Sequence, residues 1–63
     1  MTREQVLKKV YKLMSSPSVR IWAEGETVRV YKITIAGDVL ALVLYEEKAI
    51  LDGIEYDIRK GDN

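Results

Sequence analysis

The chain has 63 residues, of which 48% are hydrophobic and 32% charged, a composition that favours one folded domain, spanning 1–63, over a disordered segment. It contains no cysteine and no histidine, which excludes disulfides and the common zinc and iron–sulfur sites. The net charge is zero, and the near-neutral pI of 6.2 argues against a strong non-specific DNA binder, because such proteins are usually basic.

The sequence also carries no obvious targeting segment. No apolar run approaches the roughly 18 residues of a membrane-spanning helix, and no apolar stretch of the secretory type follows the first residues. We therefore expect a cytoplasmic protein with no membrane partner. Charged residues are abundant while Gln5 and Asn63 are the only side-chain amides, a bias typical of hyperthermophile proteins.

Positive and negative charges are distributed unevenly along the chain. Residues 1–32 contain seven basic and three acidic side chains, and residues 33–63 contain three basic and seven acidic ones. This asymmetry permits a basic face for an anionic partner, attraction between copies of the chain, or internal ion pairs.

An N-terminal helix is predicted over residues 2–15. Thr2 and Gln5 have the spacing of a capping box, and Pro17 disfavours helical geometry at the residue before it. The intervening apolar residues form one stripe, made of Val6, Leu7, Val10, Leu13 and Met14. Lys8, Lys9 and Lys12 lie opposite the stripe, either as a solvated helix surface or as a secondary basic face.

β-branched and aromatic residues dominate from Ser18 onwards, interrupted by glycine-containing breaks. They predict strands at about 18–23, 26–36, 39–46, 47–51 and 54–59. We expect a three-residue loop that ends at Gly25, and two-residue hairpin loops at Gly37-Asp38 and Asp52-Gly53.

Each expected loop fixes a strand register. The Asp52-Gly53 loop pairs Leu51 with Ile54 and Ala49 with Tyr56 on an apolar face, and Lys48 with Asp57 and Glu46 with Arg59 on a charged face. The Gly37-Asp38 loop gives apolar pairs of Ile35 with Leu40, Ile33 with Leu42 and Tyr31 with Leu44. The expected core is Leu40, Leu42, Leu44, Ile33, Ile35, Val10, Leu13 and Leu7.

The apolar residues of 39–51 change face after Glu46, which predicts a sharp bend or bulge near 46–48. The expected fold class is α+β: one N-terminal amphipathic helix followed by a strongly bent antiparallel meander of four to five strands. Such a sheet forms either a small half-open barrel or a layer covered by the helix.

In its element order, this arrangement resembles the Sm-like small barrels, whose RNA-binding loop contains Asp and Asn and whose last strands contain Arg-Gly. Asp38 and the run Ile58-Arg59-Lys60-Gly61 occupy similar places, but no Asn follows Asp38 and Lys60 separates Arg59 from Gly61. The resemblance is therefore one of topology, and no functional residue is transferred.

Catalysis is not expected. The commonest general base and the best nucleophile are absent with His and Cys, and Asp38 and Asp52 are ordinary turn residues. Glu46 and Glu47 are adjacent, and neighbouring strand residues point to opposite faces. We predict a protein that is not an enzyme, with no cofactor and no metal.

The predicted sheet face opposite the helix is the candidate site. It carries Arg20, Trp22, Lys32 and Tyr45, accompanied by Val30 and Val43. Aromatic rings and cations suit stacked bases and phosphates, but Trp, Tyr and Arg are equally enriched at protein interfaces. A third interpretation is that the sheet curls enough to bury Trp22.

A core this small usually needs a disulfide, a metal or oligomerisation for support. We therefore expect a small oligomeric protein, with a dimer favoured, that acts as a protein–protein interaction or regulatory module by self-association through the sheet. The alternative is a small nucleic-acid-binding protein that uses the face with Arg20, Trp22, Lys32 and Tyr45.

Overall fold

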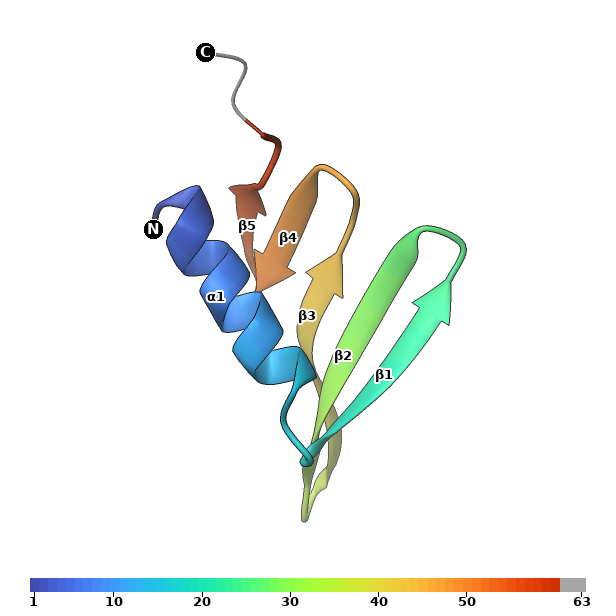
Figure 1. Cartoon of the computed structure of the whole chain (residues 1–63). Helices are drawn as coiled ribbons and strands as arrows, with labels where there is room; N and C mark the ends of the chain where they lie inside the picture. Colours follow the sequence, from blue (N-terminus) through green and yellow to red (C-terminus); the bar gives the residue numbers. More distant parts are fainter. Residues whose placement is uncertain (61–63) are drawn as a thin grey trace.

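A computed structural model describes residues 1–60 as one helix packed on a five-stranded antiparallel sheet (Figure 1). The elements are α1 (Arg3–Met14), β1 (Val19–Glu24), β2 (Thr27–Thr34), β3 (Gly37–Leu44), β4 (Lys48–Leu51) and β5 (Ile54–Asp57). The strands lie side by side in chain order and do not close into a barrel. The predicted α+β class is confirmed, in its form of an open sheet with a helix on one face. Gly61, which ends the run compared above with the Arg-Gly pair of the Sm-like barrels, lies outside the described residues.

The capping box predicted for α1 is present. The Thr2 hydroxyl accepts a hydrogen bond from the Gln5 backbone N–H at 3.2 Å, and the Gln5 side-chain oxygen accepts one from the Thr2 N–H at 2.9 Å. Val6 and Val10 are the buried residues of the helix. These two define the side of α1 that rests on the sheet, and the face of the sheet they contact is called the inner face below.

The β4–β5 hairpin has the predicted register. Asp52 and Gly53 adopt positive φ values of 51° and 83°, as a tight two-residue hairpin loop requires, and the four cross-strand pairs are those expected. The predicted ion pairs are different, however. Lys48 contacts Glu55 at 3.5 Å, diagonally across the hairpin, and Asp57 contacts Arg59 at 2.8 Å instead of Lys48.

The predicted register of the β2–β3 hairpin is wrong. The turn consists of residues 35 and 36, so that Thr34 pairs with Gly37 and Ile33 with Asp38. Gly37 follows the turn, where its φ of 123° lets the chain enter β3. Ile33, Ile35 and Leu40 are exposed and do not contribute to the core.

A β-bulge shifts the register again within the same hairpin. Tyr31 pairs with Leu40 but Val30 pairs with Leu42, which leaves Ala41 as the extra residue on β3. Ala41 and Leu42 are therefore both buried, with 4% and 0% of their surface exposed, although they are consecutive. Val30 also enters the core, so its predicted place on the face opposite the helix is wrong.

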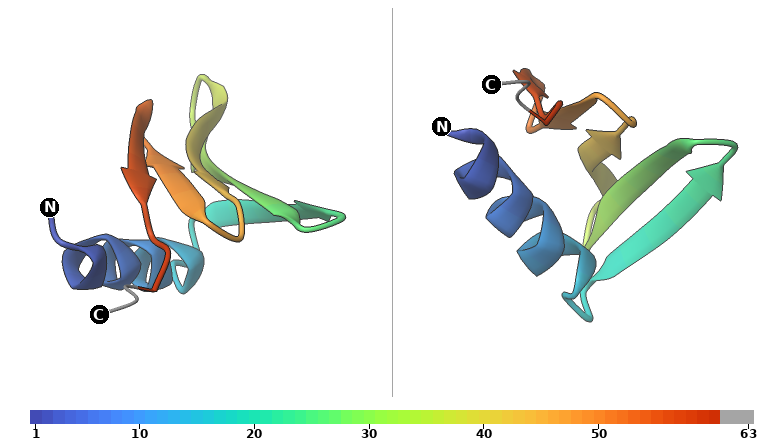
Figure 2. Two further views of the ribbon diagram at one scale, coloured as in Figure 1. Left: turned by 90° about the horizontal axis from the view of Figure 1, so that it is seen from above. Right: turned by 45° about the horizontal axis from the view of Figure 1, so that its top comes forward.

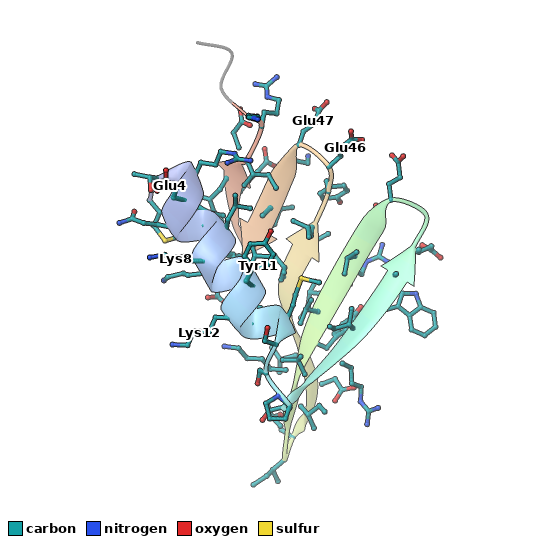
Figure 3. All side chains as sticks on the ribbon, viewed as in Figure 1. Glu4, Lys8, Tyr11, Lys12, Glu46 and Glu47 are labelled. Carbon is teal, nitrogen blue, oxygen red and sulfur yellow. The ribbon has the colours of Figure 1, made fainter. Side chains whose placement is uncertain are left out.

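Near 46–48, where the sequence predicts a bend or bulge, the chain instead reverses its direction completely. The Tyr45 N–H donates to the Lys48 carbonyl at 2.8 Å across a tight turn at Glu46 and Glu47, which Figure 3 shows between β3 and β4. β3 and β4 then pair so that Leu44 lies opposite Ala49. The apolar rows of the two strands thereby fall on the same inner face.

The β1–β2 hairpin is closed by a two-residue loop of Gly25 and Glu26, not by the expected loop of residues 23–25. Gly25 has the expected positive φ, at 60°. The hairpin projects away from α1 (Figure 2), and the molecule is elongated, with principal extents of 45 × 24 × 19 Å. The buried core lies between α1 and the strands β2–β5, and comprises Val6, Val10, Val30, Leu42, Ala49, Leu51 and Ile58.

Candidate interaction surface

The outer face of the β1–β2 hairpin carries aromatic and cationic side chains, of which Arg20 and Trp22 belong to the predicted site. Arg20 pairs with Tyr31 and Trp22 with Arg29 across the two strands, so the four side chains share one face. Together with Ile21 and Asp38 they line a shallow hollow. Trp22 is 62% exposed. We refer to Arg20, Trp22, Arg29 and Tyr31 as the outer aromatic surface.

Both arginines of the outer aromatic surface are already paired with carboxylates. The Arg20 Nε lies 3.0 Å from the Asp38 Oδ2, and the Arg29 Nη1 lies 3.7 Å from the Glu24 Oε1. The local charge is therefore balanced, which reduces the attraction for a phosphate backbone and suits a protein partner with its own mixed charges.

β1 forms the edge of the sheet, because it pairs with β2 and the strand order ends there. The Ser18 carbonyl accepts from the Ile33 N–H at 2.9 Å, and in an antiparallel ladder every second residue bonds to the neighbouring strand. The backbone groups of Val19, Ile21 and Ala23 therefore point away from β2. We refer to these groups as the β1 edge. Figure 1 shows that α1 lies on the opposite side of the molecule from this edge.

The structure gathers only part of the predicted site. Arg20 and Trp22 are together on the outer face, where Val43 is half-buried opposite Arg29. Lys32 pairs with Val19 on the inner side of the sheet. Tyr45 lies beside the β3–β4 turn, where the Lys48 ammonium sits 4.9 Å from its ring centroid.

Sequence reasoning missed Arg29 and Tyr31. Both were assigned to the face opposite Arg20 and Trp22 because the expected three-residue loop of residues 23–25 set the wrong β1–β2 register. The short spacing between Trp22 and Arg29 around Gly25 was the available signal, since a two-residue loop at Gly25 and Glu26 places them opposite each other.

A second cluster of charges lies on the other side of the molecule. Lys9 and Lys12 from α1 and Lys32 from β2 line a groove with Leu13, Ser16, Ala41, Leu51 and Asp52. Among residues 1–60, none of the three lysines has its ammonium nitrogen within 4.0 Å of a carboxylate oxygen. We refer to Lys9, Lys12 and Lys32 as the lysine groove. Lys8 is on the exposed surface of the helix, where Figure 3 shows it extending into solvent.

One carboxylate in the described part of the chain has a clearly shifted pKa. The guanidinium of Arg59 and the Arg59 backbone N–H both donate to the Asp57 carboxylate, and these hydrogen bonds lower the pKa of Asp57 below its ordinary value. The same contacts raise the pKa of Arg59. Both groups are solvent-exposed, so the pair orders the end of β5 without creating a reactive group.

Within residues 1–60, no three acidic, His or Cys side chains are grouped as metal ligands would be. The 12-residue α1, the one helix of that range, is too short to cross a membrane. The chain matches no protein-family model, no curated protein and no solved structure at a significant level.

Proposed function

We propose that this protein is a non-catalytic, cytoplasmic interaction module that forms a homodimer through the β1 edge and the outer aromatic surface beside it. The observation that carries the proposal is the exposure of Trp22, 62% of whose surface faces solvent on an edge strand. A buried aromatic side chain contributes some 150–250 Å² of buried surface, and Trp is among the residues most enriched at interface hot spots.

The small size of the core supports the same proposal. Seven buried residues form the central cluster, and a domain of about 60 residues buries only about 60% of its unfolded surface. Pairing a second copy against β1 would add apolar contacts for Ile21 and Trp22, which are both exposed in the single chain. Association would thus stabilise a fold that has no cysteine for a disulfide.

Sedimentation equilibrium over a range of micromolar to millimolar concentrations tests the proposal. We expect a concentration-dependent dimer for the wild type, and an increase in Kd of at least about 30-fold for Trp22→Ala, as for a typical hot spot. Tyr11→Ala is the matched control, because Tyr11 is 69% exposed on α1, away from β1 (Figure 3). A wild type that sediments as a 7.2 kDa monomer throughout contradicts the proposal.

The second candidate function is binding of nucleic acid, and the lysine groove is the observation that favours it. Lys9, Lys12 and Lys32 converge there, whereas the arginines beside Trp22 are occupied by Asp38 and Glu24. An electrophoretic titration with short DNA and RNA at low and high salt tests this function. Replacing Lys32 by Ala should reduce the log–log salt slope by about one. The absence of salt-sensitive binding by the wild type at tens of micromolar would remove this candidate.

A further inference from the structure

We infer that the dimer is a continuous antiparallel sheet in which β1 pairs with β1 of a second copy, with Trp22 on the two-fold axis and Arg20 opposite Glu24 of the partner subunit. This inference rests on the proposed self-association and specifies its geometry. It follows from three features of β1: which backbone groups point outwards, how the charges are spaced, and how the apolar side chains alternate.

The backbone allows only some registers. Since Val19, Ile21 and Ala23 carry the outward-pointing groups, they must lie opposite one another across the interface if hydrogen bonds are to form. A two-fold axis through a residue of β1 satisfies this condition, and the central choices are axes through Arg20, Ile21, Trp22 or Ala23. An axis through Trp22 places Ile21 opposite Ala23 of the partner subunit, with hydrogen bonds in both directions.

The charges select one of these registers. An axis through Arg20 brings two arginines together, and one through Ala23 places Trp22 opposite a carboxylate. An axis through Ile21 leaves Glu24 without a charged residue of the partner subunit opposite it. Only the axis through Trp22 places Arg20 opposite Glu24 of the partner subunit, and symmetry repeats this pair on the other side of the axis. Directly opposed strand residues of opposite charge attract, and those of like charge repel.

In this register, the ion pairs within each subunit lie next to the new pairs across the interface. Asp38 already contacts Arg20 at 3.0 Å, and Glu24 contacts Arg29 at 3.7 Å. The outer face of the dimer would then carry a row of alternating charge: Asp38, Arg20, then Glu24 and Arg29 of the partner subunit. A guanidinium has five N–H donors, so Arg20 can bind two carboxylates at once.

The side chains of β1 also suit a paired edge. The two copies of Trp22 would face each other at a non-hydrogen-bonded position, where side chains approach most closely. Edge strands that avoid pairing are often very short or carry a proline, a bulge or charged side chains, lysine above all; the charges of β1, Arg20 and Glu24, are of opposite sign and can pair between copies. β1 has no proline or lysine, and its pairing with β2 is regular over all six residues. β5, at the other end of the sheet, is only four residues long, and the Arg3 side chain bonds to the carbonyl of Ile58 just beyond it.

Two single variants and their mixture test the register. Arg20→Glu places carboxylates opposite each other in its homodimer, and Glu24→Arg does the same with guanidinium groups, so we expect each variant alone to dimerise at least about 10-fold more weakly than the wild type. In the mixed dimer every opposed pair is again of opposite charge. We expect the equimolar mixture to dimerise within about threefold of the wild type. Lys8→Glu is the control, because it makes the same charge change on α1 as Arg20→Glu makes on β1.

The outcomes separate the register from the proposed function. If the wild type dimerises but the mixture gains nothing over the single variants, the register is wrong while self-association stands. If Arg20→Glu weakens the dimer and Glu24→Arg does not, Glu24 does not lie opposite Arg20 of the partner subunit and our register is also overturned. If the wild type is a monomer, both the register and the proposed function fall.

Discussion

Leu42 is the residue whose truncation best tests the architecture. Its side chain is fully buried, and its cross-strand partners are Val30 on β2 and Leu51 on β4. Replacing a buried leucine by alanine costs about 2–5 kcal/mol, with the larger values where the surroundings cannot collapse. Leu42 is held from both neighbouring strands, so we expect about 3–5 kcal/mol. At the usual 0.05–0.15 kcal/mol per residue, a chain of this length has only about 3–9 kcal/mol in total.

Leu40→Ala is the matched control, since it removes the same atoms two residues earlier on the same strand. Leu40 is 47% exposed because the bulge at Ala41 separates it from the core. Half of its side chain is already in water, so we expect a cost of about 1 kcal/mol or less.

Thermal unfolding followed by far-UV circular dichroism measures both changes, at one fixed protein concentration because association would raise Tm. For a domain of this size, 1 kcal/mol corresponds to about 4–8 °C. Leu42→Ala should therefore lower Tm by more than about 10 °C or leave the chain unfolded, and Leu40→Ala should lower it by about 5 °C or less. Equal losses would refute the bulge, because regular alternation would bury both leucines.

Three smaller changes test local features. Thr2→Ala removes the side chain that caps Gln5 and should cost about 1 kcal/mol in urea unfolding; no loss would mean that the capping box contributes nothing. Gly53→Ala forces a side chain into a φ of 83° and should cost about 1 kcal/mol or more in the same assay, whereas unchanged stability would contradict the turn geometry. Because the pKa of Asp57 is lowered by Arg59 in the folded state, its contribution is present above the unfolded pKa and is lost as the pH falls through the folded pKa. Asp57→Asn should thus flatten the decline of Tm below about pH 4, and an unchanged slope would contradict the pairing.

The parts of the fold that local chemistry specifies could be predicted from the sequence. The start of α1 depends on Thr2 and Gln5, three residues apart, and the β4–β5 hairpin depends on the adjacent Asp52 and Gly53. In both cases the residues that determine the local structure lie within a few positions of one another and themselves form the cap or the turn. The prediction then requires no knowledge of the remainder of the chain.

The β2–β3 hairpin could not be predicted because its sequence permits several registers. Residues 39–45 are apolar without interruption, so they show no alternation that would fix which side chains face inwards. Gly37 fits equally well inside a turn or directly after one. The bulge at Ala41 depends on contacts with β2, β4 and the helix, which no short segment of sequence contains.

The errors in the candidate site follow from the loop of the β1–β2 hairpin and from the bulge in β3. The two-residue loop at Gly25 and Glu26 places Arg29 and Tyr31 on the face of Arg20 and Trp22, and the bulge places Val30 on the inner face with Leu42. Val30 and Lys32 thereby leave the predicted site and Arg29 and Tyr31 join Arg20 and Trp22. The prediction for β1 itself succeeded because β1 alternates clearly, with Arg20 and Trp22 on one face and Val19 and Ile21 on the other.

Core and surface are thus coupled through β2. Because Val30 is fully buried against Leu42, its neighbours Arg29 and Tyr31 must face outwards, where they flank Trp22. The buried side of β2 therefore fixes the chemistry of the outer aromatic surface. The helix packs over β2–β5 through Val6 and Val10, which leaves the β1 edge as the longest uncovered edge of the described sheet. Covering that edge would add buried surface to a small core, and we propose a second copy of the chain as the partner because Arg20 and Glu24 give it complementary charges.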